Sequence, residues 1–179
     1  MFGDSISAGY GLPQGAGWVA LLQQRLDREK YDYKVINASL TAETTGPARK
    51  RIGAVLAQYK PRIVILELGG NDGLRGVRIE TIRANLMAMI GDCSAHGARV
   101  LLVGMQLPPN YGSSYARKFR SMYGTLARSR RVALVPFLFE GFAADRNAFQ
   151  PDGIHPAQSA QPRMLDNVWL RLKPLLRKR

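Results

Sequence analysis

Apolar residues follow two different patterns along the chain, and these patterns predict helices that alternate with strands. Segments with an apolar residue at every third or fourth position predict helices, and short runs of almost wholly apolar, branched residues predict strands that are buried on both faces. The predicted helices cover residues 18–28, 45–59, 79–95, 114–128 and 156–176. The predicted strands cover residues 33–38, 62–68, 100–103 and 132–137.

The alternation of strands and helices predicts an α/β sandwich around a parallel sheet. The 179 residues contain no linker, repeat or low-complexity tract, so we expect a single domain over residues 1–179. Ligands of such sheets bind beyond the carboxyl ends of the strands. The turns that follow the strands are therefore where we expect functional residues.

Composition and charge exclude several classes of protein. Apolar residues make up 46% of the chain and charged residues 22%, which is typical of a globular domain. The single cysteine, Cys93, excludes an intrachain disulfide and a cysteine-cluster metal site. No apolar run reaches the ~20 residues that span a bilayer. The 26 basic and 13 acidic residues give a net charge of +13, which favours polyanions such as anionic lipid, nucleic acid or phosphorylated substrates.

Three turns are rich in glycine and polar residues, at positions 3–5, 69–72 and 152–156. A serine hydrolase needs a hydroxyl that attacks a carbonyl, an imidazole that takes the proton, and a carboxylate that orients the imidazole. Asp152 and His155 are separated by Gly153 and Ile154. One tight turn there brings the carboxylate to one ring nitrogen and leaves the other nitrogen free to face Ser5.

Ordinary structural roles remain open for each of these turns, because glycine, asparagine and aspartate favour turns in any protein. The order of the three motifs and their place at strand ends favour catalysis. Elsewhere, we expect Cys93 to be a small packed residue and His96 to cap a helix. The sequence shows no zinc-type spacing, phosphate-binding loop or dinucleotide fingerprint.

The same motifs resemble those of the SGNH (GDSL) hydrolase family. Residues 3–10 (GDSISAGY) resemble its first block, residues 67–76 (ELGGNDGLRG) its third and residues 152–156 (DGIHP) its last. The loop at residues 107–112 (LPPNYG) is similar to that of the bacterial thioesterase I/protease I/lysophospholipase subfamily and its arylesterase relatives. The resemblance runs from residue 3 to about residue 165.

The resemblance implies a fold and an activity. The fold is a flavodoxin-like three-layer α/β/α sandwich with a five-stranded parallel sheet in the order 2-1-3-4-5. The activity is hydrolysis of carboxylic esters and acyl thioesters, including aryl and alkyl esters, acyl-CoA and lysophospholipids. No metal or organic cofactor is expected. The family implies a periplasmic or secreted location, whereas the chain as written, without a signal peptide, implies a cytoplasmic one.

The resemblance also implies roles for individual residues. Ser5 is the nucleophile, His155 the general base and Asp152 the acid that orients it. The Asn71 side chain and the backbone amides of Ser5 and Ala42 stabilise the oxyanion. Substrate contacts are expected from Gly70, Asp72, Leu74, Pro108 and Tyr111.

The sequence departs from the family pattern in two places. Ala42 stands where the second block has a glycine whose amide is an oxyanion donor. If that residue needs a positive φ, its Cβ costs ~1–2 kcal/mol; if the amide swings away, turnover falls on the order of 10²–10³-fold. We expect Ala42→Gly to raise turnover. Only Met1 and Phe2 precede the first block, so we expect the natural protein to begin upstream, with a longer first strand and a secretion signal.

Two other functions remain open at this stage. One is a carbohydrate O-acetyl esterase, since the wider family includes deacetylases. The other is a basic binding protein on a weakened hydrolase scaffold. The basic residues cluster at positions 49–51, 117–120, 128–131 and 171–179. Solvated helix faces explain these clusters, and the functional alternative is docking to anionic lipid or to a phosphate-bearing thioester such as an acyl-CoA. Nucleic acid is not an expected partner, and we expect a monomer.

Overall fold

Four parallel strands lie at the centre of the structure, a computed structural model that describes residues 1–178, the side chain of Pro109 excepted. The strands are β1 (Phe2–Gly3), β2 (Ile63–Glu67), β3 (Arg99–Val103) and β4 (Ala133–Val135), and they lie side by side in that order. Leu66 pairs with Phe2 on one side and Leu102 on the other. All the carboxyl ends therefore lie at one edge of the sheet.

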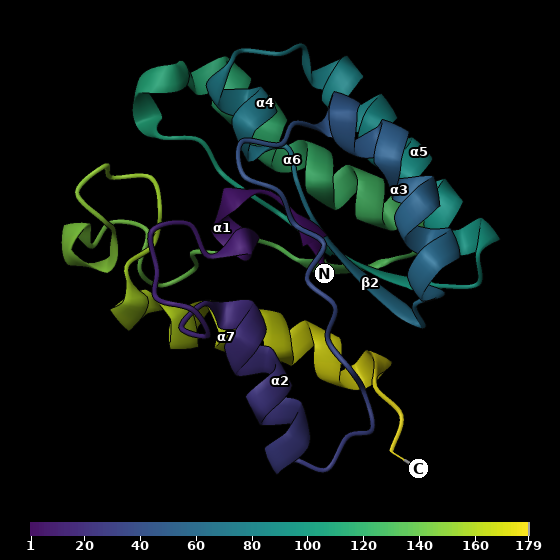
Figure 1. Ribbon diagram of the computed structural model, residues 1–179. Coiled ribbons are helices and arrows are strands. Elements are labelled where there is room, and N and C mark those ends of the chain that lie inside the picture. Colours follow the sequence, from purple (N-terminus) through teal and green to yellow (C-terminus); the bar gives the residue numbers. More distant parts are fainter. Residues whose placement is uncertain (179) are drawn as a thin grey trace.

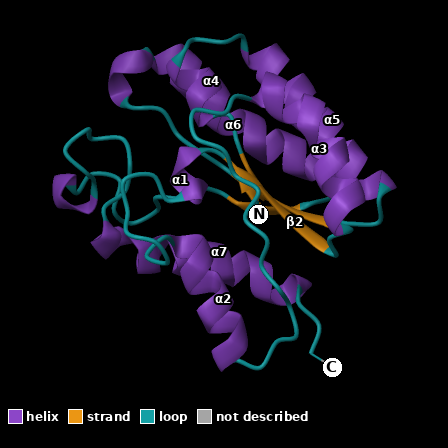
Figure 2. Cartoon of the chain, in the orientation of Figure 1, coloured by secondary structure: helices purple, strands orange, loops and turns teal. Residues whose placement is uncertain are grey.

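Helices cover both faces of this sheet (Figure 1; Figure 2). The helices α3, α5 and α6 pack together on one face, and α2 packs against α7 on the other. The α-helices are α1 (Ser5–Ala8), α2 (Trp18–Arg28), α3 (Thr45–Tyr59), α4 (Gly70–Leu74), α5 (Ile79–Ala95), α6 (Ser113–Arg130) and α7 (Gln161–Leu172). Short 3₁₀ turns are η1 (Pro109–Tyr111), η2 (Arg146–Ala148), η3 (Gln158–Ala160) and η4 (Lys173–Leu175).

The predicted α/β sandwich with a parallel sheet is confirmed, and so are the helices predicted at residues 18–28, 45–59 and 79–95. The last predicted helix, 156–176, is shorter than expected. It forms α7 with a 3₁₀ turn at each end. The strand predicted over residues 132–137 is also shorter, because the chain turns away after Val135.

The strand predicted over residues 33–38 is the main correction. The chain there is extended and lies beside β1, as the order 2-1-3-4-5 requires, but it does not form a regular strand. The Met1 amino group donates to the Ile36 carbonyl, and the Ala38 and Leu40 amides donate to the carbonyls of Met1 and Gly3. Because β1 contains only two residues, these three bonds are too few for a ladder.

The apolar stripes found in the sequence form the core. The stripe of α5 consists of Ile82, Leu86, Met89 and Ile90, which are at most 1% exposed. Cys93 continues it, and burial raises the pKa of its thiol to about 12, which makes it a packed and unreactive residue, as predicted. His96 ends the helix, with Nδ1 2.8 Å from the Asp92 carbonyl, so its predicted capping role is also confirmed.

Within residues 1–178, no helix is both long enough and apolar enough to cross a membrane.

Candidate active site

The three polar turns meet at the carboxyl edge of the sheet, as the strand pattern predicts. Ser5 is the first residue of α1, directly after β1, and Asn71 lies in α4, after β2. His155 comes from the loop that leads into η3 and α7. All three line one cavity of about 1330 Å³. The fold thus gathers residues from positions 5, 71 and 155 around a single space.

A continuous chain of hydrogen bonds connects Ser5, His155 and Asp152. The Nε2 atom of His155 lies 2.9 Å from Ser5 Oγ, and its Nδ1 atom lies 2.7 Å from Asp152 Oδ2. Ser5 is only 6% exposed, so its hydroxyl opens to the cavity and not to bulk water. This geometry lets the ring accept a proton from the hydroxyl while the carboxylate fixes the ring's tautomer.

The Asp152 carboxylate is held in its ionised form by the loop that carries it. Burial alone would raise its pKa, but hydrogen bonds from the His155 and Ile154 amides and from the His155 ring outweigh that effect and lower the pKa to about 2. The two amides donate to Oδ1 at 3.0 and 2.9 Å. Tyr10 covers the imidazole, with ring centroids 4.5 Å apart. The ring is therefore fixed by a carboxylate on one side and an aromatic residue on another.

Ala42 has a positive φ of 60°, the backbone region that favours glycine. It also lines the cavity, beside Thr41 and Asn71. The positive φ considered in the sequence analysis is therefore present, and the Cβ of Ala42 makes this backbone cost ~1–2 kcal/mol.

Arg51 ties down the loop that carries Ala42. Its guanidinium donates Nε to Glu43 Oε1 at 2.6 Å and pairs through Nη2 with the other oxygen of that carboxylate. The same Nη2 reaches the Ala38 carbonyl at 2.7 Å, and the guanidinium stacks 4.1 Å from the centre of the Phe2 ring. Both ends of the loop 38–43 and the first strand thus depend on one side chain, which the sequence analysis did not single out.

The amide of Asn71 is also oriented by neighbours. Its Nδ2 atom donates to Asp4 Oδ2 and to the Glu43 carbonyl, both at 3.1 Å. The preceding Gly69 has a φ of 108°, and a Cβ there would lie 2.5 Å from Tyr123 Oη. Only glycine therefore allows the sharp turn that brings Asn71 to the edge of the cavity.

The substrate contacts expected from the sequence divide into two groups. Gly70, Leu74 and Pro108 line the cavity. Tyr111 and Asp72, which were also expected to contact the substrate, are not among its lining residues. Asp72 is 2% exposed, and its two carboxylate oxygens accept hydrogen bonds from the Thr45 amide and hydroxyl at 2.8 and 2.6 Å. It holds the start of α3, and it does not line the cavity.

A buried pair of carboxyl groups, Asp4 and Glu67, lies directly beneath Ser5. Asp4 caps α1 by accepting from the Ile6 amide at 3.0 Å, and Glu67 Oε2 accepts from Ser7 Oγ at 2.7 Å. Burial raises the pKa of Asp4 to about 6, and burial followed by the Asp4 charge raises the pKa of Glu67 well above its ordinary value. Sequence reasoning missed this pair, although a glutamate inside an apolar strand was a visible signal.

Within residues 1–178, no three His, Cys, Asp or Glu side chains converge in a way that would hold a metal ion. The fold and the site together define an α/β enzyme of the serine-hydrolase class.

Comparison with known proteins identifies the family. The model of the GDSL-like lipase/acylhydrolase family matches residues 1–161. Esterase TesA of Pseudomonas aeruginosa is 53% identical over 174 residues, which cover 97% of this chain and 87% of that protein. Thioesterase 1/protease 1/lysophospholipase L1 of Escherichia coli K12 is 39% identical over 176 residues, which cover 98% and 83%. A crystal structure of TesA superposes with a TM-score of 0.95 at 52% identity, covering 98% of this chain and 97% of that one. The chain therefore belongs to the GDSL-like lipase/acylhydrolase family.

Replacing Ala42 by glycine should stabilise the protein by up to ~1 kcal/mol, since the relief of strain exceeds the extra entropy of an unfolded glycine. Turnover should also rise, because a relaxed residue no longer opposes the position of its amide. Urea unfolding and p-nitrophenyl ester kinetics measure the two effects. The matched control is Ala57→Gly on the exposed side of α3, which should cost ~1 kcal/mol. An equal loss of stability in both variants would contradict the assignment.

Replacing Glu67 by glutamine should make the stability less dependent on pH. In the wild type, the folded state keeps the Glu67 proton above pH 4.5, the ordinary pKa at which the unfolded chain releases it. The free energy of unfolding should therefore fall as pH rises from about that value. Glutamine carries no proton to release, so its urea midpoints at pH 5 and pH 8 should differ less. Parallel pH profiles for the two proteins would show that Glu67 is ionised in the fold.

Proposed function

We propose that this protein hydrolyses carboxylic esters and acyl thioesters through an acyl-enzyme formed on Ser5. The observation that carries this proposal is the unbroken hydrogen-bond chain from Ser5 through His155 to Asp152 at a cavity of about 1330 Å³. The names of the relatives, an esterase and a thioesterase/protease/lysophospholipase, support the same reaction class.

In the first half of the reaction, Ser5 Oγ attacks the carbonyl carbon and His155 Nε2 takes its proton. The carbonyl oxygen becomes an oxyanion, stabilised by the Ser5 and Ala42 amides and by Asn71 Nδ2. Both hydrogens of Asn71 Nδ2 are held by Asp4 and the Glu43 carbonyl, so one of them must turn to the oxyanion when substrate is bound. His155 then protonates the leaving alcohol or thiol, and the acyl group remains on Ser5. In the second half, water attacks the acyl-enzyme and gives its proton to His155, which returns it to Ser5 Oγ as the acid is released. Asp152 stays ionised throughout and stabilises the imidazolium.

The acyl part of the substrate is assigned to the apolar side of the cavity. Leu74, Met105, Leu107 and Pro108 lie there beside Gly70 and Asn71. Apolar side chains next to the oxyanion donors suit an alkyl or aryl group and offer few partners to a sugar. These apolar residues favour this function over a carbohydrate O-acetyl esterase, and the hydrogen-bonded Ser5, His155 and Asp152 favour it over a protein that only binds.

A docking surface for anionic lipid remains a further proposal, and the charge distribution supports it. Residues 44–131, which form the layer of α3, α5 and α6 with β2 and β3, hold 15 of the 26 basic side chains and four of the 13 acidic ones. Two of those four, Glu67 and Asp72, are buried. A periplasmic or secreted location follows from the family resemblance alone and stays a prediction. The monomeric state also stays a prediction.

Ser5→Ala should abolish hydrolysis of a p-nitrophenyl ester series from two to twelve carbons. The length of the preferred acyl chain then reports the depth of the apolar side of the catalytic cavity. Asp152→Asn should also lower kcat, by about 10⁴-fold, because the imidazole loses its orienting charge. Thr41→Ala, which changes a hydroxyl that lines the cavity outside the hydrogen-bond chain, is the control and should keep most of the activity. Residual turnover in Ser5→Ala equal to the wild type would exclude the serine mechanism.

Vesicles of phosphatidylglycerol should bind the protein at low salt and release it at high salt, whereas vesicles of phosphatidylcholine should not bind it. Neutralising Arg128, Arg130 and Arg131 at the end of α6 should weaken binding. The matched control removes three charges from the opposite layer, at Arg28, Lys30 and Lys34. If the two triple variants bind equally, the surface is not formed by the α3–α5–α6 layer.

A further inference from the structure

A second cavity, of about 620 Å³, lies beside the catalytic one. Five residues line both cavities: Gln106, Phe137, Phe139, Ala143 and Ala144. None of Ser5, Asp152 and His155 lines the second cavity. The two cavities therefore adjoin, and a substrate whose two ends differ in chemistry is a candidate to occupy both.

Two opposite charges line this second cavity without a partner. Arg120 comes from α6, and Glu140 comes from the chain that follows β4. Within residues 1–178, neither side chain makes a hydrogen bond or an ion pair with any other, and the two do not pair with each other. The remaining carboxylate, Asp145, is occupied, since it accepts from the Asn147 amide at 3.1 Å and lies 3.9 Å from Arg163.

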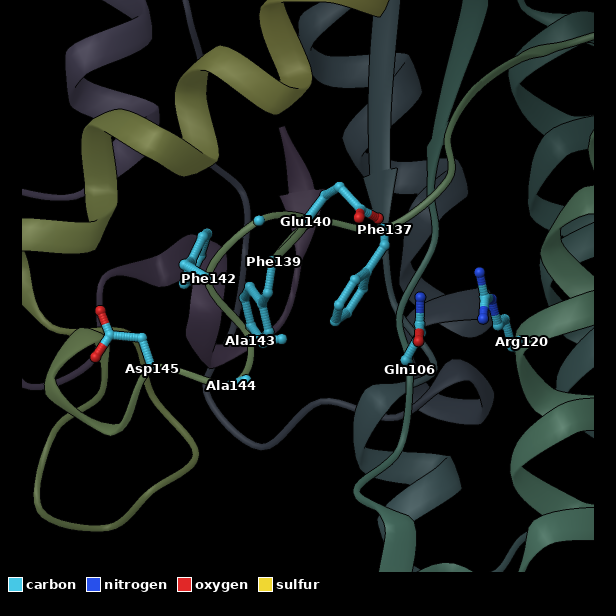
Figure 3. Close-up of a pocket in the computed structure, with 10 residues that line it drawn as sticks. Gln106, Arg120, Phe137, Phe139, Glu140, Phe142, Ala143, Ala144 and Asp145 are labelled. Atoms are coloured by element: carbon cyan, nitrogen blue, oxygen red, sulfur yellow. The ribbon is translucent and has the colours of Figure 1, made fainter.

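Aromatic side chains and one amide complete the lining. Figure 3 shows Gln106 between Arg120 and the phenylalanine side chains in this view. Phe137 and Phe139 pack with ring centroids 5.7 Å apart. The face of Phe142 is already covered by the Arg163 guanidinium, 4.9 Å from the ring centre. Phe137 and Phe139 are thus the aromatic residues that a ligand in this cavity meets together with Glu140.

This set of groups matches a ligand that carries both charges at once. A guanidinium binds phosphate oxygens through paired N–H donors. A carboxylate beside aromatic rings attracts a substituted ammonium ion. A zwitterionic phosphodiester, such as phosphocholine or phosphoethanolamine, places these two charges a few bonds apart in one molecule. A plain acyl chain would gain nothing from Arg120 or Glu140.

We propose that the second cavity is the headgroup subsite for a zwitterionic lysophospholipid. The inference rests on the proposed function, because the ester must lie at Ser5 for the headgroup to be the leaving group. Arg120 binds the phosphate, and Glu140 binds the ammonium group beside Phe137 and Phe139. The acyl chain occupies the apolar side of the catalytic cavity, near Leu74. The charged end of the substrate thus lies in the second cavity, and its apolar end lies in the catalytic cavity.

Kinetics on three substrates below their critical micelle concentrations test this assignment. They are decanoyl lysophosphatidylcholine, decanoyl lysophosphatidylglycerol, which has the phosphate but no cation, and p-nitrophenyl decanoate, which has neither. Glu140→Gln should raise KM at least fivefold for the choline lipid alone. Arg120→Gln should raise KM at least fivefold for both lipids. Neither variant should change the kinetics of the p-nitrophenyl ester.

Matched controls remove the same charges elsewhere on exposed surfaces. Arg28→Gln replaces an exposed arginine on α2, in the opposite helical layer, and Glu80→Gln replaces an exposed glutamate on α5. Both controls should behave like the wild type on all three substrates. Equal effects of Arg120→Gln and Glu140→Gln on every substrate, or no effect on either lipid, would overturn the headgroup subsite.

A binding measurement separates this proposal from the proposed function. Glycerophosphocholine should bind to the Ser5→Ala protein in a calorimetric titration, and more weakly when Glu140→Gln is added. Binding without any turnover by the wild type would keep the subsite and refute the esterase. Hydrolysis of the p-nitrophenyl ester without binding of glycerophosphocholine would keep the esterase and refute the subsite.

Discussion

The Asp4 carboxylate joins the two strand ends on which the site is built. One oxygen caps the helix that begins with Ser5, and the other accepts the Asn71 amide that follows β2. A single buried side chain therefore fixes the nucleophile relative to an oxyanion donor 66 positions further along the chain. Its neighbour Glu67 is fully buried and anchors the same turn through Ser7. Burial makes both carboxyl groups costly to ionise, so the precise placement of the site is obtained at the expense of stability.

A second layer of support comes from outside the sheet. Arg51 reaches from α3 to the loop that carries Ala42, and it also stacks on Phe2 of β1. Glu43, its partner, offers its backbone carbonyl to Asn71. The short first strand, the loop with its left-handed alanine and the asparagine amide are thus parts of one network. A guanidinium suits this position because it donates in several directions from one plane.

Most of the fold could be predicted from the sequence, because the spacing of apolar residues is a local signal. The motifs that contain Ser5, Asp152 and His155 are also short and local, and the structure brings these three side chains within hydrogen-bond distance, while their catalytic roles stay predictions. The extended segment at 33–38 was mistaken for a strand because its apolar pattern was considered apart from its partner β1, which has only two residues and cannot form a full ladder with it. Asp72 looked like a site residue because it follows Asn71, whereas its contact with Thr45 depends on packing between α3 and α4. Arg51 and Glu140 were invisible for the same reason: their roles depend on neighbours that are distant in the chain.

The uneven distribution of basic residues between the two helical layers has a mechanical consequence. Separated charge gives the molecule an electric dipole moment across the sheet, so a negatively charged plane exerts a torque on it. The layer of α3, α5 and α6 turns toward that plane, and the sheet comes to lie parallel to it (Figure 1). The carboxyl edge of the strands then faces sideways. The turns that follow the strands, which carry Ser5 and Asn71, then lie at the side of the molecule and not against the plane.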